Sequence, residues 1–328
     1  MSRAQRRRRS GTEGSNSQSY AYSGAGFRKI LAHYNSFLSE HNYDITEKEN
    51  QFCQRSLSQS FETPRGTLFH DCTFRHLNKR METRNEIGVT TLIHLLLVPS
   101  AEFEILRGKV TFKELVDSFD ERWDGTASLA EEEHLTLWLP DPQPDHSVGF
   151  SDNAFTKAQL NKLAPFLGGL NDKSAFKGTI DMLFPFFVVE AKSSKDSLII
   201  ADHQNGLSMT CALKGVVSLF QLAERAQQLH RKILGFSITY NHDIVYIFAH
   251  YPVISDRKVT YHRREVKTFS FADRDGSNRW ISRSFVLAMY RDWVPRHFEL
   301  LCSAVEALPK VNFNLSSGSI SGSLDVSS

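Results

Sequence analysis

The sequence has few cysteines, no long apolar run and almost no net charge, and each deficit excludes a class of protein. Four cysteines are scattered over 328 residues without a Cys-x-x-Cys pair, which argues against a disulfide framework or a zinc ribbon. The longest apolar runs, Leu92–Val98 and Leu183–Val189, fall short of the ~18–20 residues that a membrane span needs. The chain opens on arginines rather than an apolar stretch, so we expect an intracellular protein without a secretory signal or a membrane partner.

Several motifs of common enzyme classes are also missing. No Gly-Lys-Ser/Thr loop and no Gly-x-Gly-x-x-Gly after a strand is present, which excludes the usual nucleotide-binding loops. No His-Glu-x-x-His string of the zinc proteases and no Gly-x-Ser-x-Gly elbow of the serine hydrolases occurs. The 13 histidines are dispersed and show no metal-ligand spacing, so we expect core or surface roles for them.

Composition divides the chain into two tails and one domain. Residues 1–26 contain Arg6–Arg9 and then mostly Ser, Gly and Asn, and residues 311–328 are rich in Ser and Gly, so both ends are expected to be disordered. The arginine cluster is typical of a nuclear localisation signal or a phosphate-binding arm, and equally of a solvated basic tail. Residues 27–310 are predicted to form a single domain with a helical N-terminal part that ends at about residue 84.

The spacing of apolar residues predicts an α/β fold, with a mixed sheet flanked by helices. Leu183–Val189 is nearly continuous in apolar residues, as expected for a strand covered on both faces. Helices are predicted over Glu86–Val98, Thr111–Trp123, Asn153–Leu167 (capped by Ser151 or Asn153 and stopped at Gly168-Gly169), Asp202–Lys232 and Ser284–Leu308 (interrupted near Pro295). Further strands are predicted over Gly235–Tyr240, Ile244–Tyr251, Val259–Tyr261 and Val266–Phe271.

The most informative feature is a glutamate and a lysine at the end of the buried strand. Because side chains alternate along a strand, Glu190 and Lys192 point to the same face. Burying such a pair is costly unless the charges serve each other or a metal ion. The alternative is a strand that has emerged into solvent, where Glu-x-Lys is an ordinary exposed pair.

A metal site of this kind needs a second carboxylate, for which the sequence offers Asp145 and Asp181. Asp181 precedes Glu190 by nine positions, so along one extended strand the two lie ~30 Å apart, unless the chain reverses near Pro185. Asp145 stands at the start of a short strand-like run. If that run pairs antiparallel with the buried strand, Asp145 lies beside the end that carries Glu190. We therefore favour Asp145.

These residues resemble a known motif. Pro144-Asp145 followed by Glu190-Ala191-Lys192 is similar to the PD-(D/E)XK motif of the restriction-endonuclease-like nuclease superfamily. The order of several strings is similar to that in an uncharacterised fungal family assigned to the superfamily, over roughly Asn85 to Leu308. These strings are Arg84-Asn85-Glu86, Pro144–Phe150, Phe184–Lys192, Ala201–Asn205, Phe236–Tyr240 and His250-Tyr251.

The resemblance implies a restriction-endonuclease-like core and a role for each matching residue. It makes Asp145 and Glu190 ligands of Mg²⁺ or Mn²⁺, with the carbonyl of Ala191 as a possible third, and oxygen ligands suit such hard ions. It makes Lys192 the residue that orients or helps to deprotonate a water and offsets charge on the phosphate.

Two further residues are candidates for supporting roles. Glu86 lies on the apolar stripe of its predicted helix, where a carboxylate requires a nearby cation, although the first turn of a helix also favours Glu through the helix dipole. Gln204 lies on a helix face of small residues that packs on the sheet, near the metal site in related nucleases, and Asn205 has the same status with less support. The alternative for Gln204 is a hydrogen-bonded polar residue at a helix start.

The expected function is that of a divalent-metal-dependent nuclease that hydrolyses nucleic-acid phosphodiesters, with DNA favoured over RNA. The alternative is an inactive module of the same fold that binds nucleic acid or protein. A basic stretch of strand residues, Arg257-Lys258, His262–Arg264 and Lys267, would contact phosphates or form a solvated, charged strand edge. Oligomeric state is not indicated by the sequence.

Overall fold

The apolar run at Leu183 forms an interior strand, β4 (Leu183–Ala191), every residue of which is buried. The computed structural model describes residues 26–39, 44–123, 139–168, 173–255, 258–273 and 276–309. The Arg6–Arg9 cluster and the C-terminal tail lie outside these residues. The strand belongs to a seven-stranded mixed sheet in the order β1-β7-β6-β5-β4-β3-β2. The other strands are β1 (Ser36–Phe37), β2 (Leu115–Ser118), β3 (His146–Phe150), β5 (Gly235–Tyr240), β6 (Ile244–Ser255) and β7 (Lys258–Ser270).

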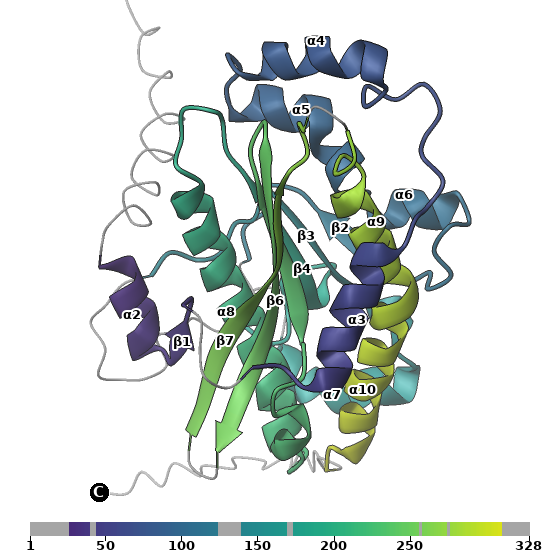
Figure 1. The fold of residues 1–328 in the computed structure, drawn as a ribbon. Helices are drawn as coiled ribbons and strands as arrows, with labels where there is room; N and C mark the ends of the chain where they lie inside the picture. The colour runs from purple at the N-terminus through teal and green to yellow at the C-terminus, as the bar shows by residue number, and fades with distance from the viewer. Residues whose placement is uncertain are drawn as a thin grey trace, which may run out of the picture.

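Helices cover both faces of the sheet, as the sequence predicts for an α/β fold (Figure 1). The long helix α8 lies on one face with α2, while α3, α9 and α10 lie on the other, and α4 and α5 lie across one end of the sheet (Figure 1). The helices are α2 (Phe27–His33), α3 (Glu47–Ser58), α4 (Asp71–Met81), α5 (Glu86–Leu97), α6 (Ala101–Leu106), α7 (Lys157–Leu167), α8 (Leu198–Leu222), α9 (Ile281–Ala288) and α10 (Val294–Ala307).

Strand pairing around β4 determines which strand ends meet. β3 runs antiparallel to β4, with His146 opposite Val189, so the start of β3 lies beside the end of β4. β5 runs parallel to β4, with Glu190 opposite Thr239 and Ala191 opposite Tyr240. Near Pro185 the chain forms a bulge, shown by the register shift between Val148 and Phe150, rather than a reversal. The predicted antiparallel arrangement of β3 and β4 is therefore confirmed.

The predicted helix over Thr111–Trp123 is wrong, because this segment contains the edge strand β2. Leu115 lies opposite Phe150, and β2 continues the antiparallel sheet beyond β3. Two aspartates account for the absence of the predicted helix. Asp117 accepts hydrogen bonds from the backbone N–H groups of Ala101 and Glu102 at the start of α6, and Asp120 has a φ of 51°, which a right-handed helix cannot contain.

The remaining predicted elements differ from the structure mainly at their ends. The helix predicted from Asn153 starts at Lys157, because Thr156 and Gln159 form a reciprocal capping box, and it ends at Gly168, whose φ is 63°. Gly169 lies outside the described residues. Helix α8 begins at Leu198, four residues before the predicted start, and the two strands predicted after Val259 form one continuous β7. The predicted interruption near Pro295 is a π-helical turn over Met289–Trp293.

Residues Glu86–Leu106 have the length and apolar composition of one membrane span. The run-length test applied to the sequence does not detect them, because polar residues interrupt the apolar ones. In the structure these residues form two helices, α5 and α6, separated by Val98–Ser100, and α5 buries Val89, Ile93 and Leu97. Ile87 and Leu95 of α5 are exposed, so the apolar residues of this segment are divided between the core and the surface.

A buried ion pair attaches α8 to the sheet. Asp202 of α8 accepts hydrogen bonds from both terminal nitrogens of Arg263 on β7, one of them at 2.8 Å, and both side chains are less than a tenth exposed. Arg263 also donates to the carbonyl of Leu38 and lies over the ring of Phe248. The basic stretch of β7 is therefore partly internal, and Arg263 is not available to a phosphate.

We expect Asp202→Ala to lower the free energy of unfolding by about 3–5 kcal/mol, because it leaves the buried guanidinium of Arg263 without its counter-ion. Urea unfolding followed by circular dichroism measures the change. The matched control is Glu62→Ala, which removes one partner of the exposed Lys109–Glu62 pair, and no measurable loss is expected. Equal losses in the two variants would contradict the structural role of the buried pair.

Candidate functional site

Polar side chains from three elements meet where β3 begins and β4 ends. Asp145 directly precedes β3, and its Oδ2 atom accepts a hydrogen bond of 2.6 Å from the backbone N–H of Ala191. Asp181, the rival aspartate, is exposed beyond the other end of β4, and eight residue steps of strand separate that end from Ala191, about 26 Å. The structure thus brings Asp145, and not Asp181, to the end of β4.

Glu190 and Lys192 lie at the same strand end, in the arrangement that the Glu-x-Lys spacing predicts. The side chain of Glu190 is only 2% exposed, and its Oε2 atom lies 3.9 Å from Nζ of Lys192. Within the described part of the chain this Oε2 atom has no hydrogen-bond partner. The strand has therefore not emerged into solvent at Glu190, which excludes the ordinary exposed pair as an explanation.

Glu86 reaches this cluster from α5. Asn85 caps the helix by accepting a hydrogen bond from the N–H of Gly88, so Glu86 is the first helical residue. Its Oε2 atom lies 3.0 Å from Nζ of Lys192, with the glutamate side chain 36% exposed. The cation that a carboxylate on this stripe requires is thus Lys192, which bridges Glu86 and Glu190.

The protonation equilibria reflect the crowding of carboxylates. Burial raises the pKa of Asp145 to about 6, with a further rise from Glu86, while Lys192 opposes the shift. Burial, and then the neighbouring charge of Asp145, raise the pKa of Glu190 well above its ordinary range. Burial alone would lower the pKa of Lys192, but Glu190, Asp145 and Glu86 together raise it. The cluster therefore favours additional positive charge.

A fourth carboxylate, Asp120, was not predicted from the sequence. Its backbone N–H donates to the carbonyl of Asp145, and its charge raises the pKa of both Asp145 and Glu190. The sequence offered no signal for this residue because it lies in the segment wrongly predicted as helical. The left-handed backbone at Asp120 turns the chain out of β2 next to the site.

Gln204 and Asn205 lie in the second turn of α8, on the face of the sheet where Glu190 lies. Asn205 donates hydrogen bonds to the carbonyl of Ile238 and to the hydroxyl of Thr239, the residue opposite Glu190 on β5. Asn205 therefore fastens the helix to the sheet. The Oε1 atom of Gln204 is buried and has no hydrogen-bond partner among the described residues. The structure gives Asn205 a structural contact and leaves the carbonyl oxygen of Gln204 without one.

Buried side chains of the elements around the site form a chain of hydrogen bonds. Oη of Tyr240 lies 2.9 Å from Nδ1 of His94, and Nε2 of His94 lies 3.0 Å from Nδ1 of His146. Nε2 of His146 lies 2.8 Å from Oδ1 of Asp117. Burial lowers the pKa of His94 to about 3, so this imidazole is neutral. The chain links α5, β2, β3 and β5, and thereby fixes the helix that carries Glu86.

The strand end brings two carboxylates beside a backbone carbonyl, which are oxygen donors of the kind that Mg²⁺ prefers. Among the described residues no three side chains of Asp, Glu, His or Cys are arranged to hold an ion. Two carboxylates can complete a coordination shell with a backbone carbonyl and waters, as Mg²⁺ sites commonly do. Oε2 of Glu190 accepts no hydrogen bond among the described residues, and the raised pKa of both acids shows that the site lacks compensating positive charge. Asp145, Glu190 and the carbonyl of Ala191 would hold the ion.

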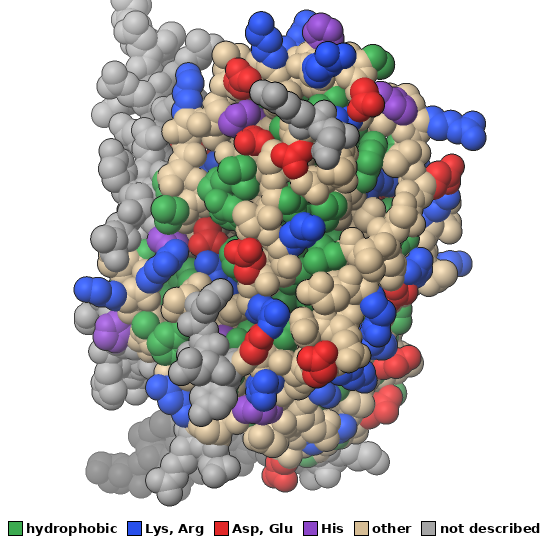
Figure 2. Space-filling model, viewed as in Figure 1, with side chains coloured by type: hydrophobic (Ala, Val, Ile, Leu, Met, Phe, Trp, Pro, Cys, Tyr) green, Lys and Arg blue, Asp and Glu red, His purple; other side chains and the backbone are tan. Residues whose placement is uncertain are grey.

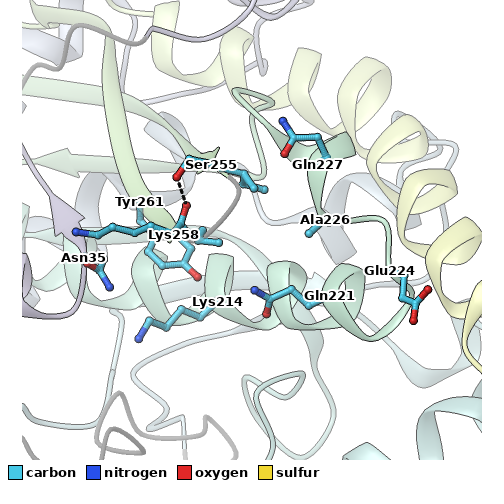
Figure 3. A pocket seen from close by; sticks show the side chains of 11 residues that line it. Asn35, Lys214, Gln221, Glu224, Ala226, Gln227, Ser255, Lys258 and Tyr261 are labelled. Atoms are coloured by element: carbon cyan, nitrogen blue, oxygen red, sulfur yellow. Dashed lines mark hydrogen bonds between the residues drawn. The ribbon is translucent and has the colours of Figure 1, made fainter.

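A separate pocket of about 600 Å³ lies at the opposite end of the sheet, beside the β6–β7 hairpin (Figure 3). Lys214, Gln221 and Glu224 of the α8 region line one side, and Lys258 and Tyr261 of β7 line another. Its side chains are a mixture of cations, amides and a carboxylate. It contains none of Glu86, Asp145, Glu190, Lys192 and Gln204, and of the basic stretch named from the sequence it contains Lys258.

The fold and the cluster define an α/β protein whose polar site lies at the end of an interior strand. A family model described as Domain of unknown function (DUF7924) matches residues 73–305, more than half of the chain, and the protein belongs to this family. Nothing matches among the curated proteins or the solved structures. The matched region runs from α4 to α10 and includes every site residue named above.

We expect Asp145→Asn to stabilise the metal-free protein by about 2–3 kcal/mol at pH 8 and by only about 1 kcal/mol at pH 4.5. The folded-state pKa of Asp145 lies above its ordinary value, so between about pH 4 and 6 the native state binds more protons than the unfolded chain. Stability therefore falls as pH rises through this window. Asparagine retains the acceptor for the N–H of Ala191 without the buried charge.

Urea unfolding in the presence of a chelator, at both pH values, measures this difference. The matched control is Asp181→Asn at the exposed end of β4, which should change stability equally at the two pH values. A pH-independent effect of Asp145→Asn would contradict the account of a buried, crowded carboxylate.

Proposed function

We propose that the protein is a divalent-metal-dependent nuclease with a restriction-endonuclease-like core, which hydrolyses phosphodiester bonds of nucleic acid. The observation that carries this proposal is the convergence of Asp145, Glu190 and Lys192 at one strand end, where a buried carboxylate oxygen of Glu190 has no hydrogen-bond partner among the described residues. The same three residues carry the resemblance to the PD-(D/E)XK motif.

The chemistry follows from the positions of the charged groups. When bound, a divalent ion supplies Lewis-acid activation of a water and of the phosphate. Asp145 and Glu190 hold and orient such an ion through carboxylate oxygens. Lys192 carries its ammonium between Glu86 and Glu190, where it can position a water and stabilise negative charge that develops on the phosphate. Glu86 restrains this ammonium group, whose other ion-pair partner is Glu190.

The second candidate is an inactive module of the same fold that binds nucleic acid or protein. In that case the cluster would be a structural remnant in which Lys192 neutralises Glu86 and Glu190. The Glu190 oxygen that accepts no hydrogen bond among the described residues favours the nuclease, and so does the excess of carboxylates, because Glu190, Asp145 and Glu86 all act on the one ammonium of Lys192.

The test is cleavage of single-stranded DNA, duplex DNA and RNA of one sequence by the purified protein with Mg²⁺, Mn²⁺ or a chelator. We expect cleavage of at least one substrate that depends on the metal. Glu190→Ala and Lys192→Ala should each lower the rate by on the order of 10²–10³-fold, as the removal of one charge-stabilising group does in other enzymes. Asp181→Asn, the matched carboxylate control, should retain the full rate.

Metal binding is measured in the same variants by calorimetry with Mn²⁺. Glu190→Ala should abolish binding, and Lys192→Ala should retain it, because only the former removes a ligand. A wild-type protein that binds Mn²⁺ and nucleic acid without cleaving either substrate class would favour the inactive module. Unchanged Mn²⁺ affinity in Glu190→Ala would show that the assigned metal site is wrong.

A further inference from the structure

A cleft of about 400 Å³ lies between α4 and α5. Its floor consists of Leu77, Leu92 and Leu68, the last of which is 41% exposed. Its rim consists of His76, Lys79 and Arg80, all exposed on α4. The cleft therefore combines apolar side chains with the charges of Lys79 and Arg80 at its edge, and covering Leu68 would be favourable.

The outer surface of α4 is basic beyond the cleft. Arg75 and Arg84 are also exposed, and Figure 2 shows blue and purple side chains gathered over the end of the molecule where α4 lies. Within the described residues none of these basic side chains forms an ion pair. The acidic residues of the same stretch are Asp71, which pairs with Arg279, and Glu82. The charge is therefore free to attract an anionic ligand.

The cleft is connected to the carboxylate cluster through α5 and the turn that precedes it. Leu92 follows Glu86 by six residues, which corresponds to about 9 Å along the helix axis. The hydroxyl of Ser194, two residues after Lys192, donates a 2.6 Å hydrogen bond to the carbonyl of Glu82 in the α4–α5 turn. Leu92 also lies about 120° around the helix from Glu86, so a chain-like ligand that extends from the cleft around the start of α5 would reach the carboxylates.

Helix α4 is held rigidly enough to present this surface. Phe74 packs edge-on against Phe69 and Phe271, and the guanidinium of Arg279 lies 4.0 Å from the Phe74 ring centroid. Arg279 in turn donates to Asp71 at 2.6 Å, at the first residue of α4. These contacts fix the inner face of α4, and its outer face is exposed to solvent.

We propose that the cleft binds an unpaired nucleobase of single-stranded nucleic acid, while Lys79 and Arg80 hold the adjacent phosphates and direct the strand to the carboxylate cluster. This inference rests on the proposed function. An aliphatic floor receives the flat face of a base, and cations at the rim receive the phosphates that flank it. A paired base does not fit, because its faces are covered by neighbouring bases and flipping it out costs a few kcal/mol.

The test is fluorescence anisotropy with a labelled single-stranded DNA 20-mer and its duplex, in a chelator so that no cleavage occurs. Wild type should bind the single strand at least about fivefold more tightly than the duplex. Lys79→Glu with Arg80→Glu should weaken single-strand binding by about tenfold or more. The slope of log affinity against log salt should fall by about 1.4, the value for two lost phosphate contacts to a single strand.

Two comparisons separate the cleft from general electrostatic attraction. Lys157→Glu with Lys173→Glu makes the same change of charge at exposed lysines at or near α7, at the opposite end of the molecule (Figure 1), and should leave affinity within about twofold. Leu68→Gln retains all charges and should reduce the preference for single strand over duplex. A 20-mer with abasic positions at its centre should bind wild type less tightly than the intact strand.

The outcomes distinguish this inference from the proposed function. Equal loss in the α7 control, a preference for duplex, or full affinity for the abasic strand would overturn the cleft as a base-binding site. If wild type cleaves and the Lys79→Glu, Arg80→Glu variant binds and cleaves normally, the inference fails and the nuclease stands. If wild type never cleaves but the variant loses single-strand binding, the nuclease fails and the cleft stands.

Discussion

The constraint on which the site depends is the burial of the Glu190 carboxylate at the end of a strand that has no exposed residue. A buried carboxylate is tolerated only when it is protonated, paired or bound to a cation. Here Asp145 lies at the same strand end, held by the N–H of Ala191, and it makes the ionised state of Glu190 still less favourable. This burial explains why the cluster needs positive charge. Lys192 supplies one ammonium group, and Glu86 lies where it pairs with that group.

Much of this strand end could be predicted because local rules determine it. Period-two alternation places Glu190 and Lys192 on one face, and the length of β4 separates Asp181 from them. The position of Asp145 required only that β3 be antiparallel to β4. Asp120 could not be predicted in this way, because the apolar spacing around it favours a helix. The segment forms a strand instead. Asp117 accepts hydrogen bonds from the start of α6, and the spacing of apolar residues gives no indication of these contacts.

The hydrogen-bonded chain beneath the site was equally beyond sequence analysis. His94 lies 52 residues from His146 and 146 residues from Tyr240, and no spacing rule relates residues so far apart. Yet the chain has a definite consequence. It ties α5 to the strands that carry Asp145 and flank Glu190, so Glu86 cannot shift along its helix axis without breaking buried hydrogen bonds, which are costly to leave unmade.

The carboxylate cluster and the basic surface of α4 have opposite charge, and the proposed nuclease would use both. A cluster with more carboxylates than ammonium groups repels a phosphate until a cation is bound, so it cannot supply the initial attraction. Exposed cations on α4 can supply this attraction. When they contact phosphates, counter-ions are released from the nucleic acid, and the release favours binding whatever the base sequence. The small net charge of +2 therefore does not indicate an uncharged surface. The carboxylates at the end of β4 and the cations on α4 are separate charged regions that this sum conceals, and the proposed nuclease would use the first to hold a metal ion and the second to attract its substrate.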